Sequence, residues 1–192
     1  KSDKYDVKIF PITWGNTPMN ALEDGNENHQ LIKSKILPEP TLDRQPDIYI
    51  QVTVPNEFQP VGKYNIGITA GIETTQCSPE WLQGLNRMDL IIVPSEHSKK
   101  VFMDSQYQQK NPAGQVVDTL KCVKPIEVLF EGIDTEIYRK TKDIPETIKS
   151  EIDNIEDKWN FLYVGHWLKG NLGEDRKDTG MLVKVFLETF KN

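Results

Sequence analysis

The loop after one predicted strand carries residues that could bind a ligand. Residues 64–69 are typical of a strand, and the run Gly71-Ile72-Glu73-Thr74 follows soon after. In an open α/β sheet, ligands bind at the carboxyl ends of the strands, which is where this loop would lie. A carboxylate such as Glu73 could accept hydrogen bonds from ligand hydroxyls there, or it could hold the loop by pairing with a nearby base.

A second polar group follows another predicted strand. Residues 89–93 form a short, continuously apolar run, which is typical of a strand buried on both faces of a parallel sheet. Ser95, Glu96 and His97 come next, at a predicted strand-to-helix turn. Ser95 also has a purely structural interpretation as a helix N-cap, and His97 would then be exposed in the first helical turn.

Segments typical of strands alternate along the chain with segments typical of helices. We expect strands at residues 6–13, 47–54, 64–69, 89–93, 126–130 and 160–164. We expect helices at residues 30–36, 78–87 and 94–102, within 142–157, and at 179–191. This alternation predicts an α/β fold, with a Rossmann-like, mostly parallel sheet flanked by helices.

The composition argues against several classes of protein. Of the 192 residues, 37% are hydrophobic, which is enough for a core, but no apolar run reaches the ~18 residues of a membrane span. The 23 basic and 29 acidic residues give a net charge of −6, whereas a nucleic-acid-binding face is basic. We therefore expect no nucleic-acid partner and no transmembrane segment. Cys77 and Cys122 predict reduced thiols in a cytoplasmic protein, either free in solution or peripheral to a membrane.

Other chemistries lack their motifs. The three histidines are far apart and match no metal-binding spacing, so we expect no metal site. The sequence has no Walker loop and no G-x-S-x-G run, which argues against a P-loop NTPase and an α/β-hydrolase.

Several motifs together carry a resemblance to a known family. They are the runs at residues 71–74, 92–102, 128–134 and 161–165, and the basic pair Arg176-Lys177. In order and spacing they resemble glycosyltransferases of the GT-B fold, most closely the family 4 type. The resemblance implies that the chain is an internal fragment, the N-terminal half of a two-domain architecture. Residues 1–141 would be an acceptor-side domain without its first strand, 142–158 a linker with a helix, and 159–192 the start of a nucleotide-sugar-binding domain.

The family resemblance implies a reaction. A sugar would pass from a nucleotide-diphosphate sugar to a hydroxyl of a saccharide, lipid or protein acceptor, with retention of anomeric configuration. No Asp-x-Asp pair is present, which fits a metal-independent enzyme, and the nucleotide sugar is a substrate, so no cofactor is expected. Since the remainder of the C-terminal domain would be missing, we expect this chain alone to be inactive.

The resemblance also assigns residues to the two substrates. The donor diphosphate would be bound by Gly165, His166, Arg176 and Lys177. Many family members have Arg where this chain has His166, which would need to be protonated to bind phosphate as strongly. The cleft on the acceptor side would be lined by Glu73, Thr74, Ser95, Glu96 and Gly132, with Glu73 and His97 as candidate catalytic residues. Gly132 is also expected to supply a positive φ in a turn.

Two other functions stay open at this point. A nucleotide-sugar epimerase could share the two-domain architecture, and a non-enzymatic α/β binding module could share the fold. Without the resemblance, Arg176 and Lys177 are ordinary solvated charges in the turn before a helix.

Overall fold

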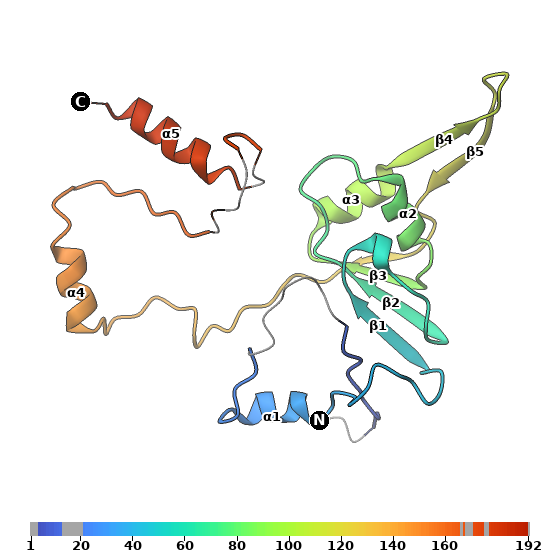
Figure 1. The fold of residues 1–192 in the computed structure, drawn as a ribbon, viewed down its shortest axis with the longest axis horizontal. Coiled ribbons are helices and arrows are strands. Elements are labelled where there is room, and N and C mark those ends of the chain that lie inside the picture. Colours follow the sequence, from blue (N-terminus) through green and yellow to red (C-terminus); the bar gives the residue numbers. More distant parts are fainter. Residues whose placement is uncertain (1–3, 13–20, 166, 168–170, 175–176, 192) are drawn as a thin grey trace. The chain divides into compact units, whose positions relative to one another are not determined.

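The computed structural model of the protein describes residues 4–12, 21–165, 167, 171–174 and 177–191. The chain divides into two compact units, Lys1–Ile133 and Asp134–Asn192, which are taken one at a time here (Figure 1). The domain limits expected from the sequence, at residues 141 and 159, stay a prediction. No helix in the described part of the chain is long and apolar enough to cross a membrane.

A four-stranded parallel sheet forms the centre of the first unit. Its strands are β1 (Ile48–Val52), β2 (Tyr64–Ile68), β3 (Leu90–Val93) and β6 (Ile126–Val128), in the spatial order β1-β2-β3-β6. All three pairings between them are parallel. With the helices beside it, this sheet is an α/β, Rossmann-like fold, so the expected fold class is confirmed.

Two helices and a short 3-10 helix pack beside the sheet and enclose the core (Figure 1). They are α2 (Pro79–Leu85), α3 (Glu96–Asp104) and η1 (Pro55–Glu57). Pro79 begins α2, as expected, because its missing N–H would have no partner in the first turn. The buried side chains of this core are Phe58, Cys77, Leu82, Leu85, Met88, Ile91, Val93, Phe102 and Ile126.

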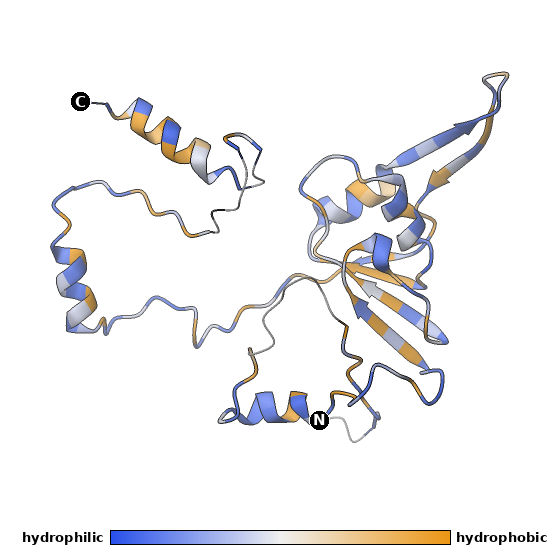
Figure 2. Cartoon of the chain, in the orientation of Figure 1, coloured by the Kyte–Doolittle hydropathy of each residue, from blue (hydrophilic) through white to orange (hydrophobic). Residues whose placement is uncertain are grey.

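The opposite face of the sheet is apolar but exposed. Side chains alternate between faces, and Ile48, Ile50 and Val52 of β1 are 56%, 55% and 68% exposed. Ile50 lies opposite Ile66, which lies opposite Leu90, and both are only half-buried. The expectation that β3 is buried on both faces is therefore wrong. Figure 2 shows the apolar residues of these strands.

A β-hairpin between α3 and β6 was not expected from the sequence. It consists of β4 (Gln106–Lys110) and β5 (Val116–Lys121), which pair antiparallel. Its turn is closed by hydrogen bonds from the Asn111 N–H to the Gln115 carbonyl (2.9 Å) and from the Gly114 N–H to the Asn111 carbonyl (2.8 Å). β4 is rich in glutamine and lysine, so it lacks the β-branched composition that indicates a strand.

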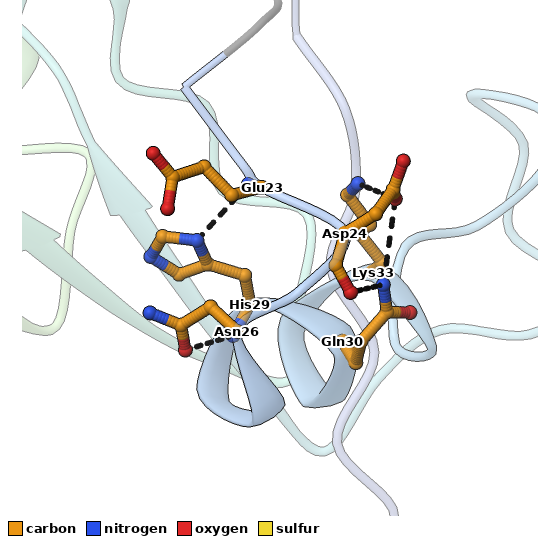
Figure 3. A network of polar contacts seen from close by, with 6 residues as sticks. All are labelled: Glu23, Asp24, Asn26, His29, Gln30 and Lys33. Atoms are coloured by element: carbon orange, nitrogen blue, oxygen red, sulfur yellow. Dashed lines mark hydrogen bonds and ion pairs between the residues drawn. The ribbon is translucent and has the colours of Figure 1, made fainter.

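A helix before β1 differs slightly from the expectation. α1 spans Glu27–Lys33 rather than residues 30–36, because Asn26 caps it and accepts hydrogen bonds from two backbone N–H groups of the first turn. The ring of His29 accepts a hydrogen bond at Nδ1 from the Glu23 N–H (3.0 Å), as Figure 3 shows. This histidine therefore closes the loop that precedes α1.

The strand expected at residues 6–13 is wrong for its described part. Ile9 makes a single parallel bridge with Ile36, by donating to the Lys35 carbonyl (2.8 Å) and accepting from the Leu37 N–H (2.9 Å). Pro11 has no N–H with which to extend the pairing. Residue 13 lies outside the described residues.

The second unit contains two helices. α4 spans Glu146–Asp153 and α5 spans Thr179–Thr189, and each lies within the range expected for it. Residues 160–164 form no strand, contrary to expectation, because no strand in the second unit pairs with them in the described residues.

An aromatic cluster holds residues 160–164 close to α5 instead. The ring of Phe161 lies 5.6 Å from the ring of Phe186 and 5.6 Å from the ring of Phe190. Contacts of this kind between ring edges and faces contribute about 0.5–1.5 kcal/mol beyond the area that they bury. Phe161 therefore packs against a helix rather than taking a place in a sheet, whereas Leu162 and Val164 stay 90% and 85% exposed.

Candidate functional site

The loop after β2 is held against the first turn of α3. Gly71 has a φ of +84°, which side chains other than glycine rarely adopt. A Cβ atom on Gly71 would lie 2.0 Å from Ser98 Oγ, so the loop backbone approaches α3 as closely as atoms permit. The position therefore requires glycine both for its conformation and for the space.

Ser95 begins α3 as a cap. Its Oγ accepts a hydrogen bond from the Ser98 N–H (3.1 Å) and donates to Ser98 Oγ (3.1 Å). The capping interpretation of Ser95 is thus confirmed. Glu96 follows in the first turn of α3 and is exposed, so its carboxylate lies in solvent at this edge of the sheet.

His97 and Thr74 are brought together by these two segments. The His97 Nε2 lies 3.3 Å from the Thr74 carbonyl oxygen. Because a carbonyl oxygen only accepts, Nε2 must carry the proton of this hydrogen bond, which leaves Nδ1 of a neutral ring free to accept. Thr74 Oγ1 donates to the Gln76 carbonyl (3.0 Å), and Glu73 is exposed in the same loop.

The structure thus joins the predicted acceptor-side residues of two loops. Carboxylates on Glu73 and Glu96 and the imidazole of His97 are all exposed near one end of the sheet. Together they offer carboxylate oxygens and a ring nitrogen that accept hydrogen bonds. This chemistry suits a ligand that carries hydroxyl groups.

Gly132 does not behave as expected. It follows β6 and is exposed, but its φ does not lie in the positive range, so it makes no left-handed turn. No atom lies within 4 Å of the position that a Cβ would take. Neither conformation nor space therefore demands glycine at this position. The pairing of β6 with β3 continues to Leu129, whose N–H donates to the Val93 carbonyl (2.9 Å).

In the second unit, Gly165 lies near the N-terminus of α5. A Cβ on Gly165 would lie 2.5 Å from Tyr163 Oη. That hydroxyl hydrogen-bonds to Thr179 Oγ1 (2.8 Å), and Thr179 is the first residue of α5 and only 4% exposed. Lys177 stands two residues before α5 and is exposed. The other two predicted donor-binding residues, His166 and Arg176, lie outside the described residues.

A surface depression lies away from all of the predicted site residues. Its volume is about 280 Å³, and it is lined by Gln83, Tyr107, Gln108, Gln109, Asp118 and Leu120. Three of its residues belong to β4, two to β5 and one to α2. Sequence reasoning missed the depression because it missed the hairpin. The pattern that could have indicated the hairpin is the turn sequence at Asn111–Gly114 followed by the β-branched residues at the start of β5.

No metal centre is indicated by the described residues, because they contain no group of three or more His, Cys, Asp or Glu side chains that could hold an ion. Both cysteines are free thiols. Burial is the main cause that raises the pKa of each, which reduces the fraction of reactive thiolate at neutral pH.

Comparisons of this chain with protein-family models, with curated proteins and with solved structures found no match.

Proposed function

We propose that this chain belongs to a glycosyltransferase that moves a sugar from a nucleotide-diphosphate donor to an acceptor hydroxyl. The proposed enzyme retains the anomeric configuration, needs no metal and works in the cytoplasm or at a membrane surface. The observation that carries the proposal is the contact of Tyr163, which lies against Gly165, with Thr179 at the N-terminus of α5, two residues after Lys177.

The donor side of the proposal rests on charge. A departing nucleoside diphosphate gains negative charge, which a helix N-terminus and cationic side chains stabilise. The 11-residue helix α5 offers such an N-terminus. Without a side chain, Gly165 would let a diphosphate approach the backbone, and Lys177, with Arg176 and His166, would supply the positive charge.

The acceptor side rests on the edge of the first unit's sheet. Glu73 would accept a hydrogen bond from the acceptor hydroxyl, and Nδ1 of His97 would be available for the proton that this hydroxyl releases. The hydrogen bond from His97 to the Thr74 carbonyl would hold the imidazole in the tautomer that this role needs.

Calorimetry with nucleoside diphosphates tests the donor site. We expect UDP, ADP, GDP or CDP to bind this chain in the presence of EDTA, and the double variant Arg176→Ala/Lys177→Ala to bind at least tenfold more weakly, which corresponds to about 1.4 kcal/mol. The matched control is Lys184→Ala, which removes a cation from α5 itself, where Lys184 pairs with Glu188 (2.7 Å). This control should bind like the unmodified chain.

Two results would contradict the donor site. One is the absence of binding by any of these nucleotides at millimolar concentration, which would favour a non-enzymatic module. The other is an equal loss of affinity in Lys184→Ala, which would show only a general charge effect. Formation of an epimerised nucleotide sugar without any acceptor would instead assign the chain to the epimerases.

A further inference from the structure

The depression between α2 and the hairpin has an apolar floor. Tyr107 and Leu120 lie directly opposite each other in the β4–β5 ladder, and both are half-buried against the core. Tyr107 is fixed in place because its Oη donates to the Cys77 carbonyl (2.6 Å). One aromatic ring and one aliphatic side chain therefore form a stable surface at the base.

Polar side chains surround this floor. Gln109 and Asp118 form the next pair on the same face of the ladder, and Gln83 reaches the depression from α2, with Gln108 beside them. Asp118 is oriented by its hydrogen bond from the Thr119 N–H (2.7 Å). The side-chain amides of Gln83, Gln108 and Gln109 have no hydrogen-bond partner within the described part of the chain. Each of these side chains can therefore both donate to a ligand and accept from it.

The charge of the depression limits what it can bind. Asp118 is the one charged residue that lines it, and no Lys or Arg does so. A phosphate or a nucleotide would therefore meet a carboxylate and no cation, which is unfavourable. A neutral ligand with many hydroxyls would meet amides and a carboxylate that match it.

We propose that this depression binds one ring of a neutral saccharide. The apolar face of the ring would lie on Tyr107 and Leu120, while its hydroxyls would hydrogen-bond to Gln83, Gln109 and Asp118. The volume of about 280 Å³ lies just below the roughly 300 Å³ at which sites for drug-sized ligands begin, so it suits no more than a single ring. The inference does not rest on the proposed function, because none of the residues assigned to donor or acceptor binding lines this depression.

Chemical-shift perturbation in the ¹⁵N-labelled chain tests the site. The probes are glucose and the methyl glycosides of glucose, galactose, mannose and N-acetylglucosamine, with glucose 6-phosphate as the anionic comparison to glucose. We expect at least one neutral glycoside to bind with a Kd on the order of 1 mM, as weak single-ring sites do. The shifts should be confined to α2, β4 and β5, and glucose 6-phosphate should bind more weakly than glucose.

Three variants distinguish the site from a general effect. Gln109→Leu should weaken binding at least fivefold, whereas Gln106→Leu, an identical change on β4 outside the depression, should leave it unchanged. Asp118→Asn should retain most of the affinity, because an amide still accepts from a hydroxyl. Each variant's unbound spectrum verifies that the hairpin is folded.

Any of three outcomes would overturn the inference. They are the absence of perturbation by every neutral glycoside, unchanged binding by Gln109→Leu, and tighter binding of glucose 6-phosphate than of glucose. Nucleoside diphosphates titrated into the same sample report on the donor site separately, so failure of one site is not confused with failure of the other.

Discussion

Asp89 links two neighbouring strands of the sheet through a single carboxylate oxygen. Its Oδ2 accepts from the backbone N–H of Asn65 (2.8 Å) and from the Asn65 side chain (3.2 Å). Asn65 is itself buried and exchanges hydrogen bonds with the backbone of Gly62. The backbone hydrogen bond, followed by that of the side chain, lowers the pKa of Asp89.

The lowered pKa of Asp89 makes stability depend on pH. The folded-state pKa of Asp89 lies below the ordinary value of about 3.9. The ionised carboxylate therefore contributes its full share to the free energy of unfolding above about pH 3.9, and this share is lost as the pH falls through the folded-state pKa. In Asp89→Asn, we expect the urea midpoint to fall less between about pH 5 and pH 2 than in the unmodified chain. Asp153→Asn, which removes an exposed carboxylate from the second unit, should retain the original pH dependence.

Some residue roles were visible in the sequence, and others needed the fold. The N-cap at Ser95 was predictable, because a cap depends on its own residue type and on its neighbours along the chain. The contact between His97 and Thr74 joins residues 23 positions apart and depends on where two loops meet. The positive φ lies at Gly71, in the loop that contacts Ser98 of α3, and not at Gly132, and this placement depends on the path of the folded loop rather than on a local sequence signal.

At the scale of elements, the tightest contact is between α2 and η1. A Cβ on Gly84 would lie 1.7 Å from the Pro55 carbonyl oxygen, and Pro55 is buried at the start of η1. Backbone atoms cannot move aside as a side chain can. The absence of a side chain at Gly84 therefore sets how closely α2 packs on the segment that follows β1.

Gly84→Ala should consequently destabilise the first unit. Alanine would gain about 1 kcal/mol in helix propensity, but overpacking against a fixed carbonyl costs about 1–3 kcal/mol, so we expect a net loss. Urea denaturation monitored by fluorescence measures this loss of stability as a lower midpoint. Gly132→Ala, where a Cβ meets nothing within 4 Å, should have the same midpoint as the unmodified chain. Equal midpoints for both variants would show that α2 can shift freely.

The elements that could be predicted share a clear local signal. β1, β2 and β3 are rich in β-branched residues, and α2 and α3 begin with recognisable caps. The hairpin was missed, and residues 160–164 were misassigned as a strand, for opposite reasons. The polar composition of β4 concealed a strand, whereas the apolar run at residues 160–164 resembles a strand although it pairs with none and only the ring of Phe161 is shown to contact α5.

At the scale of the whole molecule, the hydrophobic core is confined to part of the chain. Every member of the main core cluster lies between Phe58 and Ile126. Residues 139–144 have exposed side chains and no regular secondary structure. Protease access should therefore differ sharply between these regions, because cleavage requires an extended and accessible backbone.

Limited trypsin digestion should cut after Arg139, Lys140 or Lys142 before it cuts anywhere between residues 46 and 133. Arg87 provides the internal comparison, since its guanidinium donates to the carbonyls of Phe58 (2.7 Å) and Asn56 (2.7 Å). Mass spectrometry of the early products measures the order of cleavage. A first cut at Arg87 would mean that the core opens more readily than the connecting segment.

The order of the strands has a consequence for the exposed sheet face of Ile48, Ile50 and Val52. Moving along the chain, each new strand is added on the same side of the previous one, from β1 to β6. Crossovers between parallel strands are almost always right-handed, so successive steps in one direction place every connecting helix on the same face. Further units added beyond β6 in that direction would cover the same face again. A helix that connects a strand added beyond the β1 edge, in the opposite direction, would cover the isoleucine and valine rows instead.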